Sequence, residues 1–168
     1  TALTLNSATA VTADSSIAAG SGTVTLGAAT LSDGVTLRLG TGSSGAFTAT
    51  SFAGTAAGTA SHVTFNVTGA VTVSGTIGTD IGTLTVTNSG GATFSGAVGA
   101  SSDRIASVIL TATTGTVAFS SDLYATGITN AGGSFNLNLY GTNTNVTNAV
   151  TFGTSGTVAF GNGGNHFI

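Results

Sequence analysis

Apolar side chains alternate with threonine, serine or asparagine in short runs along almost the whole chain, as in Val63-Thr64-Phe65-Asn66-Val67. Glycine, asparagine, aspartate and serine separate one run from the next. A period of two residues is typical of β-strands with one buried face, and these separators mark turns. Strong helix formers are scarce, because Lys, Glu, Gln and Met are all missing from the 168 residues. The sequence therefore predicts an all-β fold made of many short strands.

Several of these runs repeat. Gly-Thr-Val-Ala-Phe occurs at 115–119 and again, unchanged, at 156–160, and related segments open at Gly69, Gly91 and Gly115 at nearly equal intervals. Periods of about 20 to 50 residues are the signature of solenoids, and a period of ~24 divides this chain into about seven turns. We predict a single domain over 1–168, a parallel β-solenoid (β-helix) of about seven turns. A β-sandwich filament subunit is the alternative.

The chain contains no proline. Inner strands of a solenoid pair on both edges and need every backbone N–H, which excludes proline from them. The absence therefore favours the solenoid over an antiparallel sandwich. Residues 41–62 are the exception to the pattern: alanine, glycine, serine and threonine interrupt the alternation there, and we expect an irregular turn or a protruding loop.

Charged residues make up only 4% of the chain, with two arginines, five aspartates and a net charge of −3. Nucleic-acid binding is not expected, because a basic patch is missing. Membrane insertion is not expected either, because no purely apolar run of about 18 residues occurs. The lack of cysteine removes disulfides and thiolate metal sites. A chain without thiols tolerates an oxidising exterior, so we expect an extracellular or cell-surface location.

Few side chains are suited to catalysis. His62 and His166 are the only imidazoles and lie far apart in the chain, and neither Cys nor Glu is present to complete a zinc site. No Gly-x-Ser-x-Gly nucleophile elbow occurs. We therefore predict that the protein is not an enzyme, and we assign no catalytic, cofactor-binding or metal-binding residue.

The carboxylates lie beside small residues in predicted turns; they are Asp14, Asp33, Asp80, Asp103 and Asp122. Aspartate in a turn commonly bonds the backbone two residues further on, and this is the role expected here. A calcium-binding edge and a pair of hydrolytic carboxylates are the functional alternatives. Like charges repel when stacked, which favours different corners for them. Surface ion pairs are expected between Asp103 and Arg104 and between Asp33 and Arg38.

Threonine-rich runs such as 83–87 and 142–147 suggest an ice-binding face, since stacked threonines on a flat surface can order water. The motif does not recur once per turn at one place in the sequence, which weighs against that function. A carbohydrate-binding solenoid would use aromatic side chains, and the two tyrosines, Tyr124 and Tyr140, support that function only weakly.

Asn66 and Asn145 begin glycosylation sequons inside predicted strands. Asn136 and Asn138 are expected on an outer face, and 161–165 to form a turn built on Asn-Gly.

The repeats resemble those of very large bacterial surface proteins, the filamentous-haemagglutinin-like and autotransporter-passenger adhesins. The segments that carry the resemblance are 69–75, 92–99, 122–129 and 148–160, so it covers 63–168 well and 1–62 loosely. It implies a right-handed parallel β-helix, secretion across the outer membrane and a role as stalk, adhesin or filament. It supplies no catalytic residues.

These observations predict an extracellular structural protein that forms a surface filament, stalk or adhesin. The two ends of a solenoid expose unpaired strand edges that can template another chain. The expected partners are second copies stacked head to tail or flanking repeats of the same chain, since the sequence has the character of an excerpt, and a surface glycan as adhesion target.

Overall fold

The computed structural model describes residues 1–56, 58–161 and 163–168, and every strand in them runs in one of two parallel sheets. The ten-stranded sheet contains β1 (Leu3–Leu5), β2 (Thr9–Val11), β4 (Val24–Leu31), β6 (Phe47–Gly54), β8 (Val71–Val73), β9 (Ile77–Gly78), β11 (Ala92–Phe94), β13 (Thr116–Phe119), β15 (Asn136–Leu139) and β17 (Val158–Phe160). The eight-stranded sheet contains β3 (Ser15–Ile17), β5 (Thr36–Ser43), β7 (Ser61–Val67), β10 (Ile81–Asn88), β12 (Ile105–Leu110), β14 (Leu123–Asn130), β16 (Asn143–Val146) and β18 (Asn165–Phe167).

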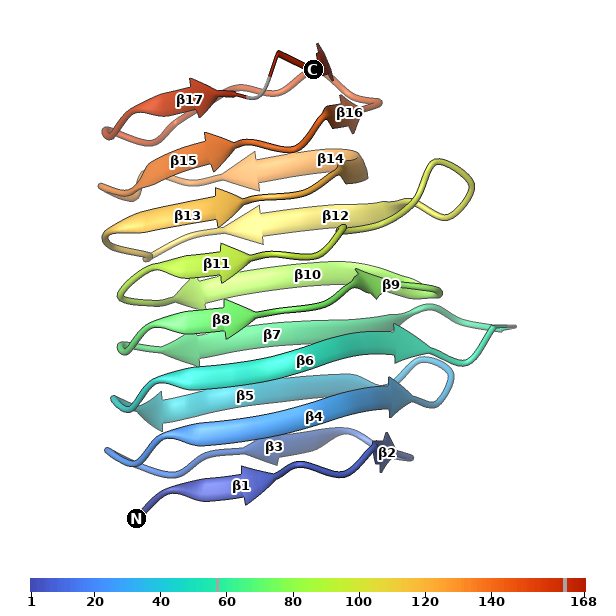
Figure 1. The fold of residues 1–168 in the computed structure, drawn as a ribbon, viewed down its shortest axis with the longest axis vertical. Helices are drawn as coiled ribbons and strands as arrows, with labels where there is room; N and C mark the ends of the chain where they lie inside the picture. The colour runs from blue at the N-terminus through green and yellow to red at the C-terminus, as the bar shows by residue number, and fades with distance from the viewer. Residues whose placement is uncertain (57, 162) are drawn as a thin grey trace.

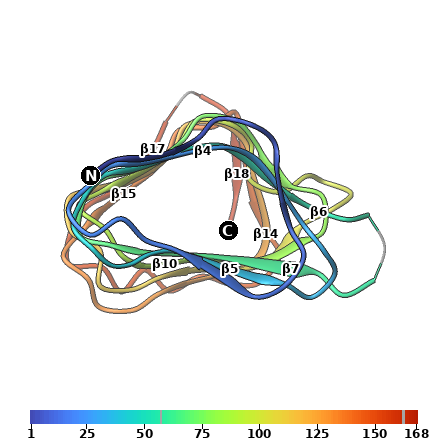
Figure 2. The same cartoon turned by 90° about the horizontal axis from the view of Figure 1, so that it is seen from below.

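The chain winds as a β-solenoid of about seven turns, which confirms the predicted fold class. In Figure 1 the near strands run to the right and the far strands return to the left while the chain climbs from the N- to the C-terminus, so the coil is right-handed. Figure 2 shows a three-sided cross-section. We call the side formed by β1, β4, β6, β8, β11, β13, β15 and β17 the front face, and the opposite side, with β3, β5, β7, β10, β12 and β14, the back face. The sandwich alternative is wrong, because all pairing between named strands is parallel.

Turn length varies along the coil. On the front face, Leu3 pairs with Val24, Val24 with Phe47, and Phe47 with Val71, so each of these turns is slightly longer than the one before it. On the back face, Leu37 pairs with Val63, and the turn between them is longer still. Connections of unequal length absorb this variation on the front face, and irregularities within the β5–β7 and β7–β10 pairs absorb part of it on the back face.

The repeats found in the sequence coincide only partly with this register. The two copies at 115–119 and 156–160 lie two full turns apart, because Val117 pairs with Leu137 and Leu137 with Val158. The alignment of Gly69 with Gly91 is wrong by one residue, since Ala92 pairs with Val71. A slip of one residue exchanges the two faces of a strand, so the buried side chains decide the register there.

The expectation of a turn or loop over 41–62 is wrong for most of that segment, although Ala57 lies outside the described residues. Phe47–Gly54 forms the long strand β6, which pairs with β4 along its length. Phe47 and Phe52 point inward and are fully buried. Two aromatic anchors and pairing on both edges outweigh the weak strand propensity of the alanines and glycine around them.

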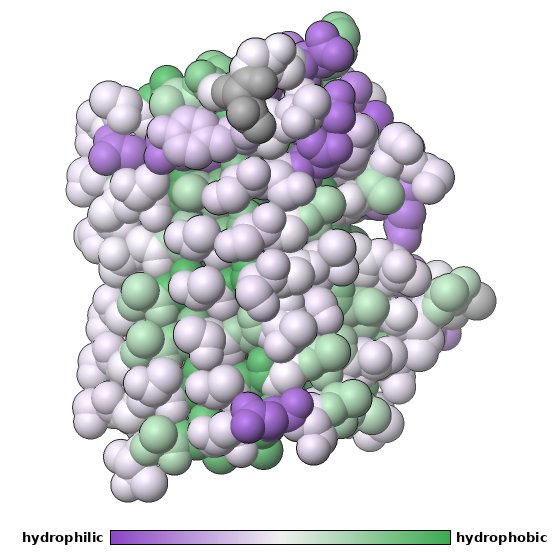
Figure 3. All heavy atoms as spheres, in the orientation of Figure 1, coloured by the Kyte–Doolittle hydropathy of each residue, from purple (hydrophilic) through white to green (hydrophobic). Residues whose placement is uncertain are grey.

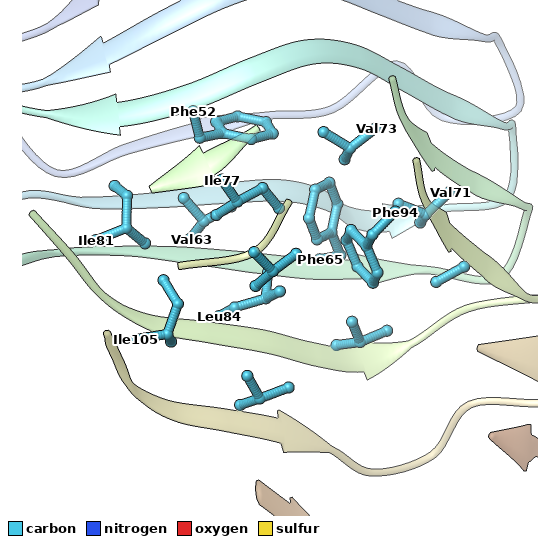
Figure 4. Packing of buried hydrophobic residues seen from close by; sticks show 14 of the residues in the cluster. Phe52, Val63, Phe65, Val71, Val73, Ile77, Ile81, Leu84, Phe94 and Ile105 are labelled. Atoms are coloured by element: carbon cyan, nitrogen blue, oxygen red, sulfur yellow. The ribbon is translucent and has the colours of Figure 1, made fainter. Parts of the chain in front are cut away.

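The core is a stack of inward-facing apolar side chains from both sheets (Figure 4). Phe65 lies at its centre, with ring centroids 5.7 Å from Phe47, 5.9 Å from Phe52 and 6.3 Å from Phe94. The pairs with Phe47 and Phe52 are edge-to-face, an arrangement that aromatic quadrupoles favour. Phe94 stacks on Phe119 at 5.0 Å and continues the aromatic chain into the next turn.

Glycines occupy the corner that leads into the front face. This glycine corner lies two residues before the first inward residue of the front-face strands β4, β6, β8, β11, β13 and β17, and consists of Gly22, Gly45, Gly69, Gly90, Gly115 and Gly156. A Cβ at Gly45 would lie 2.0 Å from the Gly22 carbonyl oxygen, and one at Gly69 would lie 2.5 Å from the Gly45 oxygen. At these glycines consecutive turns therefore approach too closely for a side chain.

Candidate functional surfaces

The five aspartates lie in the connections that lead into strands of the eight-stranded sheet. Asp14 precedes β3, Asp33 precedes β5, Asp80 precedes β10, Asp103 precedes β12 and Asp122 precedes β14. None of the five lies within a strand, as the sequence predicted. The third side of the coil is formed by β2, the C-terminal ends of β4 and β6, β9 and Val98. The predicted separation onto different corners is not observed, because four of the aspartates follow this side and only Asp122 comes before it.

Four of these carboxylates bond to neighbouring turns instead of to residues two positions further on. Asp14 accepts the backbone N–H of Thr36 at 2.8 Å, and Asp103 accepts that of Asp80 at 3.0 Å. Asp122 accepts both the backbone N–H and the side-chain amide of Asn143, each at 2.9 Å. Stacking places the next turn within hydrogen-bond distance, so the expected local bond is replaced by one that joins turns. Asp14, Asp33, Asp103 and Asp122 therefore link adjacent turns, whereas the buried Oδ2 of Asp80 has no hydrogen-bond partner among the described residues.

The arginines also differ from the prediction. Arg38 forms an ion pair with Asp14 at 3.8 Å instead of with Asp33, and both side chains are more than half exposed. Arg104 donates to the carbonyl oxygens of Asn145 at 3.0 Å and Ala125 at 3.4 Å. Its guanidinium also lies 5.7 Å from the centre of the Tyr124 ring, within the range of a cation–π contact. The predicted pair of Asp103 with Arg104 does not form among the described residues.

The two histidines lie in different parts of the coil. His62 is on β7 between Thr36 and Thr83 of the adjacent strands, and His166 is on β18, with β16, β14, β12 and β10 between them in the sheet. The His166 ring makes an edge contact with Phe160 at 5.2 Å, and its Nε2 lies 3.1 Å from the Gly161 oxygen. In the described part of the chain, no three His, Cys, Asp or Glu side chains gather in a way that could hold a metal ion.

The asparagines singled out in the sequence lie on the outside of strands. Asn136 and Asn138 flank the buried Leu137 on β15, as predicted, and Asn136 accepts the N–H of Thr157 at 2.9 Å. The sequon asparagines are within β7 and β16. Asn162, part of the turn expected over 161–165, lies outside the described residues.

One column of threonines runs up the outside of the front face. The threonine column consists of Thr4, Thr25, Thr48, Thr72 and Thr93, each paired with the next across adjacent strands. Single threonines therefore recur at one register position over these five turns, although the sequence shows no Thr-x-Thr motif that recurs in every turn. Unequal turn lengths concealed the recurrence. The column ends where Ala118 pairs with Thr93.

A shallow trough of about 230 Å³ lies beside the threonine column. Its lining consists of Thr25, Leu26, Thr48, Ala49, Thr50, Thr72 and Ser74. Thr50 and Ser74 stand one outward position further along their strands, so hydroxyls border the trough on both sides. Figure 3 shows apolar surface between the pale polar side chains of this face. None of the eight front-face strands contains a charged residue.

The two ends of the coil carry most of the exposed large apolar side chains. Leu5 of the first turn is 37% exposed, and in the last turn Phe160 is 47%, Phe167 62% and Ile168 39% exposed. Tyr140, one turn earlier, is the remaining member of this group among the described residues. At each end the outermost strands pair on one edge only.

Comparison with known proteins adds no relative: no protein-family model, no curated protein and no solved structure matches this chain. The described part of the chain also contains no helix long and apolar enough to span a membrane.

Proposed function

We propose that this chain is an extracellular, non-enzymatic structural module of a surface filament, stalk or adhesin, lengthened by stacking further coils on its ends. The observation that carries the proposal is the placement of exposed apolar surface: Leu5 at one end and Phe160, Phe167 and Ile168 at the other, above a core that is otherwise closed. An open apolar layer over unpaired strand edges favours another coil on top of it.

The two ends are complementary in kind. The strands at both ends belong to the same parallel sheets, so the free edge of β17 offers the hydrogen-bonding pattern that β1 needs. The inward residues also correspond, because Val158 and Phe160 continue the columns that begin with Leu3 and Leu5. A head-to-tail contact of this kind does not close on itself and yields an open fibre.

The titratable side chains support a structural role. Asp14, Asp103 and Asp122 bond to neighbouring turns, and Arg104 holds two further turns through backbone carbonyls. Each such bond adds about 1 kcal/mol or more when charged groups take part. Distributed along the axis, they resist separation of the turns. A rod at the cell surface needs this resistance to separation of its turns. A surface glycan is the adhesion target that we propose.

Sedimentation velocity and electron microscopy of the whole chain test the stacking. We expect assembly that grows with protein concentration and fibres of solenoid width. Leu5→Asp and Phe160→Asp each place a charge on one end and should stop growth, whereas Thr129→Asp, on an exposed back-face position, should not. Because each end variant keeps one intact end, a mixture of the two should form pairs and no fibres.

A wild-type chain that sediments as a monomer at every concentration contradicts assembly from second copies. Fibres that survive both end variants contradict the proposed contact, because they would have to form through another surface. Circular dichroism of each variant shows whether the coil itself is intact.

A further inference from the structure

We propose that the outer front face from β1 to β11 binds ice. The proposal is independent of end-to-end stacking, because it uses the side of the coil instead of its ends. It rests on the threonine column, on the hydroxyl-lined trough beside it and on the absence of charge from the front-face strands. The ligand is an ordered lattice of water at a crystal surface.

The sheet sets the spacing of the hydroxyls. Adjacent strands lie about 4.8 Å apart, and outward positions on one strand are about 6.7 Å apart. Two O–H···O bonds of about 2.8 Å can span the strand spacing, so one water can bridge two hydroxyls held at that spacing, whereas the hydroxyls of Thr25 and Thr48 already contact each other at 3.3 Å. Thr48 and Thr72, with Thr50 and Ser74 beside them, form a two-dimensional set of such positions. Ice presents a matching kind of surface, a periodic array of hydrogen-bonding oxygens.

The hydroxyls are held in place before any ligand binds. Threonine is stiff at χ1, so ordering it costs little entropy. The Thr48 hydroxyl is further restrained by contacts of 3.3 Å with the hydroxyl of Thr25 and with the Val24 carbonyl oxygen. A rigid lattice binds best to a rigid array, because neither side has to reorganise.

The face is uncharged in a chain that carries its charges elsewhere. All five aspartates lie in connections leading into the eight-stranded sheet, Arg38 lies on β5, and Arg104 directly precedes β12. Charged groups hold hydration shells tightly and disturb the water around them. The threonine methyl groups and the small apolar floor of the trough leave water free to adopt the lattice arrangement, while the hydroxyls anchor it.

Carbohydrate is the less suitable occupant of this face. Sugar-binding surfaces generally combine polar groups with aromatic side chains, which dominate the lining of most ligand sites. The outward positions of β1, β4, β6, β8 and β11 carry no aromatic residue. The outward-facing Tyr140 lies beyond β15, past the end of the threonine column.

Thermal hysteresis and partitioning of the chain into a growing ice hemisphere test the proposal. We expect the wild-type chain to depress the freezing point below the melting point and to enrich in the ice. Thr48→Tyr places a bulky ring at the centre of the array and should abolish most of both effects. Thr85→Tyr is the matched control, because Thr85 is also an outward, half-buried threonine in a column, on the back face.

If Thr48→Tyr loses thermal hysteresis and ice partitioning while Thr85→Tyr retains both, the front face is supported as the ice-binding surface. Both variants must also keep the wild-type circular dichroism spectrum. Exclusion of the wild-type chain from ice overturns the proposal. The proposal is also overturned if the two variants lose thermal hysteresis and ice partitioning equally, or if Thr48→Tyr keeps both at the wild-type level. Binding to insoluble polysaccharide without any effect on ice identifies a different ligand and overturns it as well. Fibre formation is measured separately, so either proposal can fail alone.

Discussion

The central turns and the last two turns of the coil use the same strand register with different inward side chains. Along the third side of the coil, one inward column holds Phe52, Ile77, Val98 and Leu123, all buried, and then continues with Thr144 and His166. On the back face, a second column holds Leu39, Phe65, Val86 and Leu110, and then Asn130. In these two columns the central turns hold only apolar side chains, whereas polar side chains enter toward the C-terminal end.

This difference teaches that stability in a solenoid is local. Each turn contacts only its neighbours, so the free energy of unfolding is approximately a sum of turn and interface contributions. A turn with apolar inward residues and neighbours on both sides contributes strongly. A turn with polar inward residues and one neighbour contributes less, and we expect it to open first.

The largest effect is expected from truncating the central aromatic core. Phe65 is fully buried among Phe47, Phe52 and Phe94, so Phe65→Ala should lower the free energy of unfolding by about 3–5 kcal/mol. Phe160→Ala, in the open last turn, should cost less than about 1 kcal/mol because the side chain is already 47% exposed. Denaturant unfolding measures both. Similar losses at the two positions would mean that the last turn is as well packed as the centre.

A smaller effect is expected at the glycine corner. Gly69→Ala brings a Cβ to 2.5 Å from the Gly45 carbonyl oxygen, and forcing these backbones apart should cost about 1–3 kcal/mol. Gly78→Ala is the control, since no atom of the residues that the structure describes lies within 4 Å of a Cβ built there, and it should be neutral or stabilising by a few tenths of a kcal/mol. The thermal midpoints of the two variants should therefore shift in different directions or by clearly different amounts. The turn that begins with β15 departs from this rule, because Phe135 occupies the corner position and is buried there. The last turn follows the rule again, since a Cβ at Gly156 would lie 2.2 Å from the Phe135 carbonyl oxygen.

The smallest effect should be a gain in stability near the C-terminal end. The Thr144 hydroxyl is buried without a hydrogen-bond partner among the described residues, so Thr144→Val should raise the free energy of unfolding by about 1 kcal/mol. Thr113 is equally buried, but its hydroxyl contacts that of Ser89 at 3.5 Å. Thr113→Val should be destabilising, because it leaves the serine without that partner. If both variants are destabilised, the Thr144 hydroxyl has a partner such as buried water.

Much of the fold could be read from local patterns. The alternation around Val63, Phe65 and Val67 predicts a strand with those three side chains inward, and all three are buried. The absence of proline agrees with strands paired on both edges. Residues 47–54 were not recognised, because two buried phenylalanines outweigh the alanine- and glycine-rich background there.

The candidate surfaces could not be read in the same way. Asp14, Asp103 and Asp122 bond to partners a full turn of the coil away, beyond the reach of any local turn rule. The ion pair of Arg38 with Asp14 joins two turns for the same reason. The threonine column was concealed because the intervals between its successive members are unequal, so no fixed period aligns them.

The sequence by itself determined which face of each strand is apolar, because alternate side chains must point to opposite sides of a pleated strand. Only the tertiary structure decided which residues of successive turns meet. That register depends on how each connection absorbs its extra residues while the core columns stay aligned, and no local pattern encodes the outcome. The same register that buries Phe65 among its neighbours places the five threonines above one another on the outside.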